Sequence, residues 1–355
     1  MSNLISKVYF LPIGDTEISD EAISALAGNL LKEFIQREGI QLPQEMPIKV
    51  HFGERGNSTY IKSACYNGII DVLKKNNVST CFAETSVLYG GSRFSKEKHI
   101  KLACDHNFTQ LPICIADGSR GEDAIDVPSS GKYFKSCSIA KALAEAPGVL
   151  VASHFKGHAL AGFGGAIKQL SMGFASKGGK LAMHMGVKPQ IFSPLCKACQ
   201  KCVVRCNENA IEKNGKKFKI NHDKCVGCGA CFSICPSYAV WIFSLSGFVN
   251  MLLKKSTFKE KLGEYAAAAV KGKANIYINF ALNITSGCDC EPRPMRKCCK
   301  NIGIFISKDP VAIDKACWDL VAQHGKKFKG MEQLQYASSL GAGNMEYNLL
   351  QINNI

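Results

Sequence analysis

Two cysteine runs decide how this sequence is organised: 196-CKACQKCVVRC-206 and 225-CVGCGACFSICP-236. Each run places its cysteines with the spacing C-x2-C-x2-C-x3-C, and the second run ends in Cys-Pro. The first run contains Cys196, Cys199, Cys202 and Cys206, and the second contains Cys225, Cys228, Cys231 and Cys235. Because both runs share one spacing, we interpret them as two matching sets of metal ligands.

This spacing resembles that of bacterial-type two-cluster ferredoxins over about 50 residues, and it predicts two [4Fe-4S] clusters. Three thiolates of one run bind one cluster, while the fourth reaches the other cluster. The first predicted cluster takes Cys196, Cys199, Cys202 and Cys235, and the second takes Cys225, Cys228, Cys231 and Cys206. Zinc is the alternative, since C-x2-C pairs also build zinc sites. Two runs of four cysteines with one spacing favour clusters over zinc.

Cysteine is abundant in the rest of the chain as well, with 18 cysteines among 355 residues. No signal peptide is recognisable in Met1–Ile13, so we expect a cytoplasmic protein whose thiols bind metal or carry out redox chemistry. The apolar stretch Ala239–Leu253 is too short to span a bilayer, and we predict that it forms a buried helix. Exposed clusters and thiols would make such a protein oxygen-sensitive.

Alternating strand and helix patterns fill the first 190 residues, which is typical of α/β proteins with a largely parallel sheet. Strands are predicted at 8–13, 48–52, 78–82, 111–116 and 149–153. Helices are predicted at 20–37, with Asp20 as the N-cap, and near 60–74, 96–105 and 138–146. After the cysteine runs, helices are predicted at 258–270 and from Pro310, and strands at 276–282 and 302–306.

The position of the cysteine runs within this pattern predicts the domain organisation. The fold class is α/β, with a mostly parallel sheet domain formed by residues 1–190 and 241–355. An α+β two-cluster ferredoxin-like domain is inserted at 191–240. We expect the last part to rejoin the first, because about 115 residues interrupted by a cysteine-rich loop would form a poor domain alone.

Several short motifs outside the runs carry a second resemblance. They are 50-VHFGE-54, 88-LYGGSR-93, 153-SHFKGH-158, 162-GFGGAIK-168, 287-GCDC-290 and 309-DPVAID-314. Through them the chain resembles the uncharacterised iron-sulfur-centre proteins grouped as domain of unknown function 362, over nearly its whole length. The resemblance implies a redox protein of the kind found in anaerobes, and it brings no established substrate or reaction.

His154, Lys156 and His158 follow the predicted strand 149–153 and precede a glycine-rich stretch. Parallel sheets bind ligands at the carboxyl ends of their strands. Lysine, histidine and glycine amides suit an anionic ligand such as a carboxylate or phosphate. We therefore predict that these three residues are catalytic, as proton donors or ligand anchors, at a site for a small anionic substrate. The alternative is that the histidines are hydrogen-bonded structural residues.

Charged residues follow two further predicted strands. Glu54 comes after the strand 48–52, and Arg93 follows the glycine turn after Tyr89. Both could face the same crevice at the end of the sheet. The alternative is that the glycines make turns and the charges are solvated.

Four further thiols lie in the loop Cys288–Cys299, as Cys288-Asp289-Cys290 and the adjacent pair Cys298-Cys299. Cys288 and Cys290, with His184, could bind a third metal, or the thiols could form a redox-active disulfide. A C-x-C pair and two adjacent cysteines constrain the geometry of a single tetrahedral site. The loop also supports an alternative function, a metal- or cluster-handling protein that uses these cysteines with His154 and His158.

The net charge of +15 suits docking of an acidic electron-carrier protein. Aromatic residues are not interleaved among the lysine clusters, which argues against nucleic acid as the partner. We therefore predict an iron-sulfur electron-transfer protein whose clusters pass electrons between a redox partner and a site in the α/β domain. Some 300 residues outside the cysteine runs exceed what a simple electron shuttle needs, which favours an oxidoreductase or a subunit of one.

Overall fold

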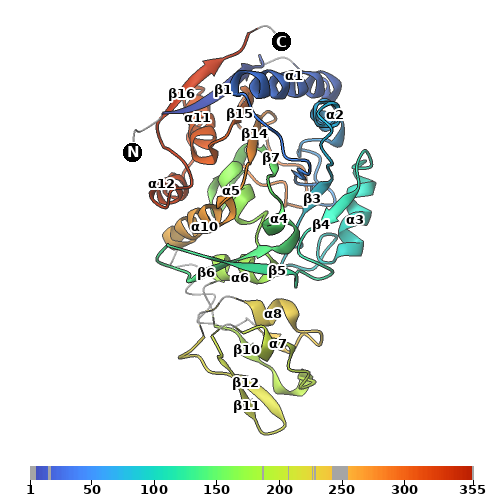
Figure 1. The fold of residues 1–355 in the computed structure, drawn as a ribbon, viewed down its shortest axis with the longest axis vertical. Coiled ribbons are helices and arrows are strands. Elements are labelled where there is room, and N and C mark those ends of the chain that lie inside the picture. The colour runs from blue at the N-terminus through green and yellow to red at the C-terminus, as the bar shows by residue number, and fades with distance from the viewer. Residues whose placement is uncertain are drawn as a thin grey trace.

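The computed structural model describes residues 5–14, 17–185, 188–206, 208–225, 227, 229–241 and 255–353. Figure 1 shows a large body, which contains the described residues before 186 and after 254, and a smaller lobe formed by the described residues between 188 and 241. The described cysteines of both runs lie in this lobe.

Among the described residues, the largest sheet has eight strands in the order β16-β1-β15-β14-β7-β2-β3-β4. These strands are β1 (Ser6–Pro12), β2 (Ile48–Lys49), β3 (Phe82–Glu84), β4 (Ile113–Ile115), β7 (Leu150–His154), β14 (Ile276–Ala281), β15 (Gly303–Ser307) and β16 (Tyr347–Gln351). Neighbouring strands run parallel except that β15 is antiparallel to both β1 and β14. The prediction of an α/β fold with a mostly parallel sheet is therefore confirmed.

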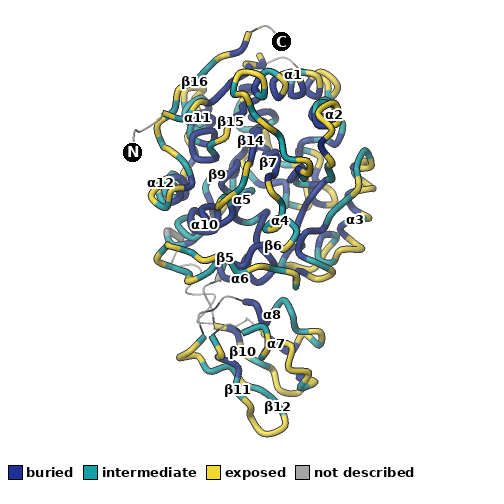
Figure 2. The backbone as a smooth tube through the Cα atoms, in the orientation of Figure 1, coloured by how far each residue is buried: buried dark blue, intermediate teal, exposed yellow. Residues whose placement is uncertain are grey.

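Helices cover both faces of this sheet (Figure 1). They are α1 (Asp20–Glu38), α2 (Asn67–Lys75), α3 (Lys96–Asp105), α4 (Lys141–Glu145), α5 (Ala166–Ser171), α6 (Lys177–Met185), α10 (Lys255–Val270), α11 (Pro310–Gln323) and α12 (Glu332–Ser339). Alternate side chains of β1 enter two cores. Tyr9 and Leu11 belong to the core that includes residues of α1 and α2, whereas Val8 and Phe10 belong to the core that includes residues of α5, α10 and α11. Strands buried on both faces explain the continuous apolar runs in the sequence (Figure 2).

Smaller elements surround the sheet and build the lobe. In the body they are the 3-10 helix η1 (Ser63–Tyr66) and the hairpins β5 (Ala124–Pro128) with β6 (Ser136–Ala140) and β8 (Lys156–His158) with β9 (Gly162–Gly164). In the lobe they are β10 (Gln190–Ile191), η2 (Ser193–Leu195), α7 (Lys201–Val204), β11 (Ile211–Asn214), β12 (Lys217–Ile220), α8 (Ala230–Ile234) and β13 (Val240–Trp241). The lobe has its own small core around Ile211, Cys231 and Val240.

Local details differ from the sequence predictions at several places, and the predicted strand at 78–82 overlaps β3 at Phe82 alone. The N-cap of α1 is Ser19, whose hydroxyl accepts from the Ala22 amide, so Asp20 is the first residue of the helix. Residues 138–140 belong to strand β6, because they pair with β5, and the helix there is limited to α4. Most of the predicted buried helix at 239–253 lies outside the described residues, and Val240–Trp241 within it forms β13.

The chain before the lobe and the chain after it share one sheet, since β7 pairs with β14. The lobe contacts the body through α8, which packs against α6. The contact is close: a Cβ atom added at Gly178 would lie 2.9 Å from the carbonyl carbon of Gly229. Arg205 also forms a bidentate ion pair with Asp126 of β5, with distances of 2.8 and 3.2 Å. The exact division into domains stays a prediction.

No helix in the described part of the chain is long and apolar enough to cross a membrane.

Candidate functional site

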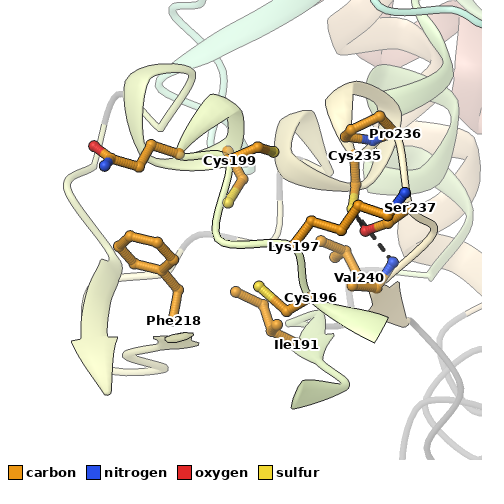
Figure 3. Close-up of a pocket in the computed structure, with 12 residues that line it drawn as sticks. Ile191, Cys196, Lys197, Cys199, Phe218, Cys235, Pro236, Ser237 and Val240 are labelled. Atoms are coloured by element: carbon orange, nitrogen blue, oxygen red, sulfur yellow. Dashed lines mark hydrogen bonds between the residues drawn. The ribbon is translucent and has the colours of Figure 1, made fainter. Parts of the chain in front are cut away.

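Cysteines from both runs surround a small cavity in the lobe. The thiols lining it are Cys196, Cys199 and Cys202 of the first run and Cys235 of the second. Figure 3 shows Cys196, Cys199 and Cys235 around this cavity, with Ile191, Phe218 and Val240 as apolar neighbours. The structure thus brings together the four residues predicted to bind the first cluster.

A second small cavity gathers the remaining described cysteines of the two runs. It is lined by Cys206, Cys225 and Cys231, together with apolar residues that include Ile211 and Ile220. Cys228, the other predicted ligand of the second cluster, lies outside the described residues. This cavity therefore combines Cys206 of the first run with Cys225 and Cys231 of the second run.

The backbone of the lobe turns its amides towards these sulfurs. The amides of Ala239, Ala210 and Ala198 donate to the sulfurs of Cys235, Cys206 and Cys196 at 3.3, 3.3 and 3.5 Å. Ala198 itself has a left-handed φ of 53°, an uncommon conformation for a residue other than glycine. Such local strain is typical of functional sites. Amide donors of this kind stabilise negative charge on sulfur.

The four thiols that line the first cavity would repel one another if all of them were ionised. Burial, followed by the neighbouring thiolates of Cys235, Cys196 and Cys199, raises the pKa of Cys202 to about 11. Burial also opposes ionisation of Cys235, but hydrogen bonds from Ser237 and nearby amides outweigh it and lower the pKa of this thiol. Four thiolates could therefore coexist here when a cationic group lies between them.

A much larger cavity, of about 650 Å³, lies in the body. Its described lining residues come from the chain before the lobe and from the chain after it. They are His51, Glu84, Thr85, Val87, Leu88, Tyr89, Arg93, His158, Ala159, Leu160, Lys168, Gln169, Met172, Gly173, Lys180, His184, Phe258, Ser286, Gly287, Cys288, Cys290, Glu291, Arg293 and Met295. The lining therefore combines polar and cationic side chains with apolar ones. This composition is typical of sites for small molecules.

Arg93 on the cavity wall is fixed by neighbouring polar groups. Its Nε donates to Glu54 at 3.0 Å, and its other nitrogens contact the Tyr89 hydroxyl and, at 2.9 Å, the Nε2 of His51. Burial, followed by the charge of Arg93, lowers the pKa of His51 to about 3. Glu84 lies 3.6 Å from Arg93. The structure therefore brings Glu54 and Arg93 together, but of these two only Arg93 is among the described residues that line the cavity. His51 stays neutral beside Arg93.

His154 and Lys156, two of the predicted catalytic residues, do not line the cavity in the described structure. Both are buried against Asp289: His154 Nδ1 lies 3.0 Å from one carboxylate oxygen, and Lys156 Nζ lies 2.6 Å from the other. His154 Nε2 faces the carbonyl oxygen of Leu282 at 2.8 Å. Burial opposes ionisation of Asp289, but His154 and Lys156 hold its pKa well below the usual range. These residues fix the turn that carries Cys288 and Cys290.

His158, the third predicted catalytic residue, does line the cavity, and so do Cys288 and Cys290. One nitrogen of His158 and the two sulfurs lie within 4.8 Å of one another, a grouping that could hold a metal ion. Lys168 Nζ donates to the sulfur of Cys288 at 3.7 Å. The hydrogen bond from Cys290, aided by Lys168 and opposed by burial, lowers the pKa of Cys288 well below its usual value.

The remaining predicted residues are divided between the cavity and other places. His184 on α6 lines the cavity and stacks on Phe258 with ring centroids 4.9 Å apart. Burial lowers the pKa of His184 to about 3. Among the described lining residues, neither Cys298 nor Cys299 is found. Lys180, which was not predicted, reaches the cavity from α6 and has no motif around it.

The fold and the site together define a class, an α/β protein with a cysteine-dense lobe beside a large polar cavity. The chain belongs to the family described as Domain of unknown function (DUF362), whose model matches residues 47–319. This confirms the family resemblance that the motifs indicated.

Curated relatives match the chain over short segments. It is 38% identical over 55 residues to pyruvate synthase subunit PorD of Methanocaldococcus jannaschii, which covers 15% of this chain and 63% of that subunit. It is 34% identical over 55 residues to PorD of Thermotoga maritima, with 15% and 56% covered. It is 40% identical over 45 residues to one subunit of an ion-translocating oxidoreductase complex of Methanosarcina acetivorans, with 13% and 17% covered. The chain therefore spans less than two thirds of each of these relatives.

Two solved structures are distantly similar. A Thermotoga maritima protein from a structural genomics effort is 11% identical with a TM-score of 0.43, and the match covers 87% of this chain and 60% of that chain. The lactate racemase apoprotein from Thermoanaerobacterium thermosaccharolyticum is 12% identical with a TM-score of 0.37, with 78% and 51% covered.

Proposed function

We propose that this chain is an iron-sulfur electron-transfer protein whose lobe holds two [4Fe-4S] clusters and delivers electrons to the cavity in the body. The grouping of the cysteines carries the proposal. Cys235 joins the first three cysteines of the first run around one cavity, and Cys206 joins Cys225 and Cys231 of the second run around the other. This exchange of one cysteine between runs is the ligand arrangement of two-cluster ferredoxins.

The chemistry of the donors supports the fit of such clusters. Each group offers thiol sulfurs, backbone amides that donate to sulfur, and apolar side chains that limit access of water. When bound, the clusters supply one-electron transfer at low potential. The relatives named as subunits of pyruvate synthase and of an ion-translocating oxidoreductase complex are consistent with a redox role.

Helix α6 provides the physical connection between the lobe and the cavity. Its Gly178 packs against Gly229, the residue that precedes α8, and α8 carries Cys231. Two other α6 residues, Lys180 and His184, line the cavity. Continuous packing of this kind provides a short path for electrons through protein. We propose that the chain is an oxidoreductase or a subunit of one. A small anionic substrate binds in the cavity of the body, and an acidic carrier protein docks on the basic lobe.

The test is the iron, sulfide and metal content of protein purified without oxygen, combined with electron paramagnetic resonance during reduction. We expect about eight iron atoms and eight sulfides per chain, with interacting signals from two reduced clusters. Cys202→Ala should lose about half of the iron, whereas Cys104→Ser, which changes an exposed cysteine in the body, should lose none. Stoichiometric zinc in place of iron would refute the proposal.

A further inference from the structure

Cys288 and Cys290 lie on one turn at the wall of the large cavity. The amide of Cys290 lies 3.5 Å from the sulfur of Cys288, and Lys168 Nζ lies 3.7 Å from the same sulfur. Cys288 is 3% exposed, while Cys290 is half-buried. A thiolate at Cys288 therefore has both a cation and an amide donor beside it, and a second thiol within reach.

The hydrogen bonds of His158 decide what its ring offers to these sulfurs. Nδ1 accepts hydrogens from the amides of Leu160 and Ala161 at 3.2 and 3.1 Å. A neutral imidazole whose Nδ1 is an acceptor carries its hydrogen on Nε2. Burial, followed by the charge of Lys168, lowers the pKa of His158 and so keeps the ring neutral. Nε2 then offers a hydrogen to Cys288 instead of a lone pair to a metal ion.

The turn that carries the two cysteines is anchored at Asp289. Asp289, between the two cysteines, is fully buried and bound by His154 and Lys156. Its carbonyl oxygen accepts from the Glu54 amide at 3.1 Å. The two thiols are therefore presented to the cavity by a buried anchor.

We propose that Cys288 and Cys290 form a redox-active pair that alternates between dithiol and disulfide. The inference rests on the proposed function, because the electrons come from the two clusters of the lobe. The Sγ–Sγ bond breaks when it takes up two electrons, one from each cluster, and one proton. The proton goes to Cys290, and Cys288 remains a thiolate beside Lys168 and His158. Two one-electron donors match the two electrons that one disulfide requires.

The substrate class that fits this pair is a small disulfide bearing a carboxylate. The Cys288 thiolate attacks one substrate sulfur, which forms a mixed disulfide and releases the first thiolate. Cys290 then gives its proton to the released substrate thiolate. The Cys290 sulfur attacks the Cys288 sulfur of the mixed disulfide, which releases the second substrate thiolate and restores the Cys288–Cys290 bond. Arg93, Lys180 and Arg293 line the cavity and would attract the carboxylate.

The first experiment counts electrons in the full-length protein with its clusters loaded. The protein is oxidised with diamide, desalted, and titrated without oxygen with reduced methyl viologen, a one-electron donor. We expect about two electrons per chain beyond those that reduce the clusters. Iodoacetamide labelling with peptide mass spectrometry should find Cys288 and Cys290 blocked before the titration and free after it. Cys290→Ser should lose the two additional electrons, whereas Cys104→Ser should keep them.

The second experiment tests the thiolate and the substrate class. Lys168→Met should slow alkylation of Cys288 by about tenfold relative to Cys104 in the same sample. The reduced protein should react at least about tenfold faster with 3,3′-dithiodipropionate, which carries two carboxylates, than with cystamine, which carries two ammonium groups, when each rate is divided by the rate of dithiothreitol with the same disulfide. This difference should disappear in Cys288→Ser.

The outcomes separate this inference from the proposed function. If the clusters load and are reduced but no additional electrons are consumed, the redox pair is refuted and the proposed function stands. A stoichiometric additional metal that protects both thiols from alkylation would replace the pair with a metal site. Equal rates with the two disulfides, each divided by its rate with dithiothreitol, would overturn the substrate class. Absence of iron from the wild-type chain would refute the proposed function itself.

Discussion

Cysteines gather at two places in this protein, in the lobe and on the wall of the large cavity, and the two places are built differently. In the lobe, the thiols come from two runs of eleven and twelve residues, and the spacing within each run sets the grouping. On the cavity wall, Cys288 and Cys290 meet His158 and Lys168 because the sheet places β7 beside β14. Short-range spacing therefore organises one site, and the topology of the sheet organises the other.

The two sites also differ in the groups that hold them. The lobe relies on backbone amides and a small apolar core. The cavity wall relies on buried charges, among them Asp289 with Lys156 and His154. Removal of one partner from a buried ion pair is costly, whereas the lobe contains no comparable buried pair among its described residues. Single substitutions should therefore affect the two sites separately.

The largest effect is expected from Asp289→Ala. The change leaves Lys156 and His154 buried without their carboxylate, which should cost about 3–5 kcal/mol of unfolding free energy. The midpoint of thermal unfolding should fall sharply, while the iron content per chain should not change. The exposed carboxylate Asp105 provides the control, since Asp105→Ala should have little effect. A parallel loss of iron would show that the two sites are not independent.

Lys180→Met should change how stability depends on pH. Burial lowers the pKa of Lys180 from 10.5 to about 8, so the unfolded chain binds more protons between these values. The wild-type protein therefore gains stability over the variant as pH rises from 8 to 10.5, by up to about 3 kcal/mol. Native-state hydrogen exchange of the β7 and β14 amides measures this difference. If the difference in unfolding free energy between the wild type and the variant stays constant across that pH range, burial does not lower the pKa of Lys180.

Gly178→Val should disturb the contact between α6 and α8. The added side chain would meet the backbone at Gly229, at a cost of about 1–3 kcal/mol. Reduction of the Cys288–Cys290 disulfide should slow by about tenfold while the iron content is retained. Gly14→Val is the matched control, because no atom of the described residues beyond its chain neighbours lies within 4 Å of a Cβ atom at Gly14. Unchanged reduction kinetics in Gly178→Val would exclude α6 as the electron path.

The smallest effect is expected from Arg205→Ala, which removes the ion pair between the lobe and Asp126. Both side chains are partly exposed, at 22% and 19%, so the change should cost less than about 1 kcal/mol. Limited proteolysis of the lobe measures the effect. Rapid cleavage of the lobe in the variant would show that this pair, and not the α6–α8 contact, holds the lobe on the body.

Much of the fold was predictable because buried strands are continuous apolar runs. The predicted helix at 96–105 coincides with α3, and the strand at 276–282 coincides with β14 to within one residue. The segment 138–146 was only partly predicted, because β6 exists through pairing with β5, whose residues lack a clear alternating pattern. Pairing between strands is a tertiary property that local sequence does not report.

The candidate sites were predictable to different extents for the same reason. The cysteine spacing suffices to group the lobe thiols. By contrast, the sequence identified His154, Lys156 and His158 without separating their roles. Only the position of Asp289 shows that the first two are anchors, while His158 faces the cavity. Lys180 could not be predicted because a lysine on a short helix carries no signal of its own.

The pairing of β1 has a consequence for how the chain is made. This strand precedes the other strands of the sheet in the sequence, whereas its two neighbours, β15 and β16, follow all of them. During translation β1 therefore remains unpaired until β15 and β16 have been synthesised. The lobe is synthesised before these two strands and can already fold around its own core. We expect the lobe to be able to bind the proposed clusters before the main sheet closes, and the nascent protein to depend on chaperones in the interval.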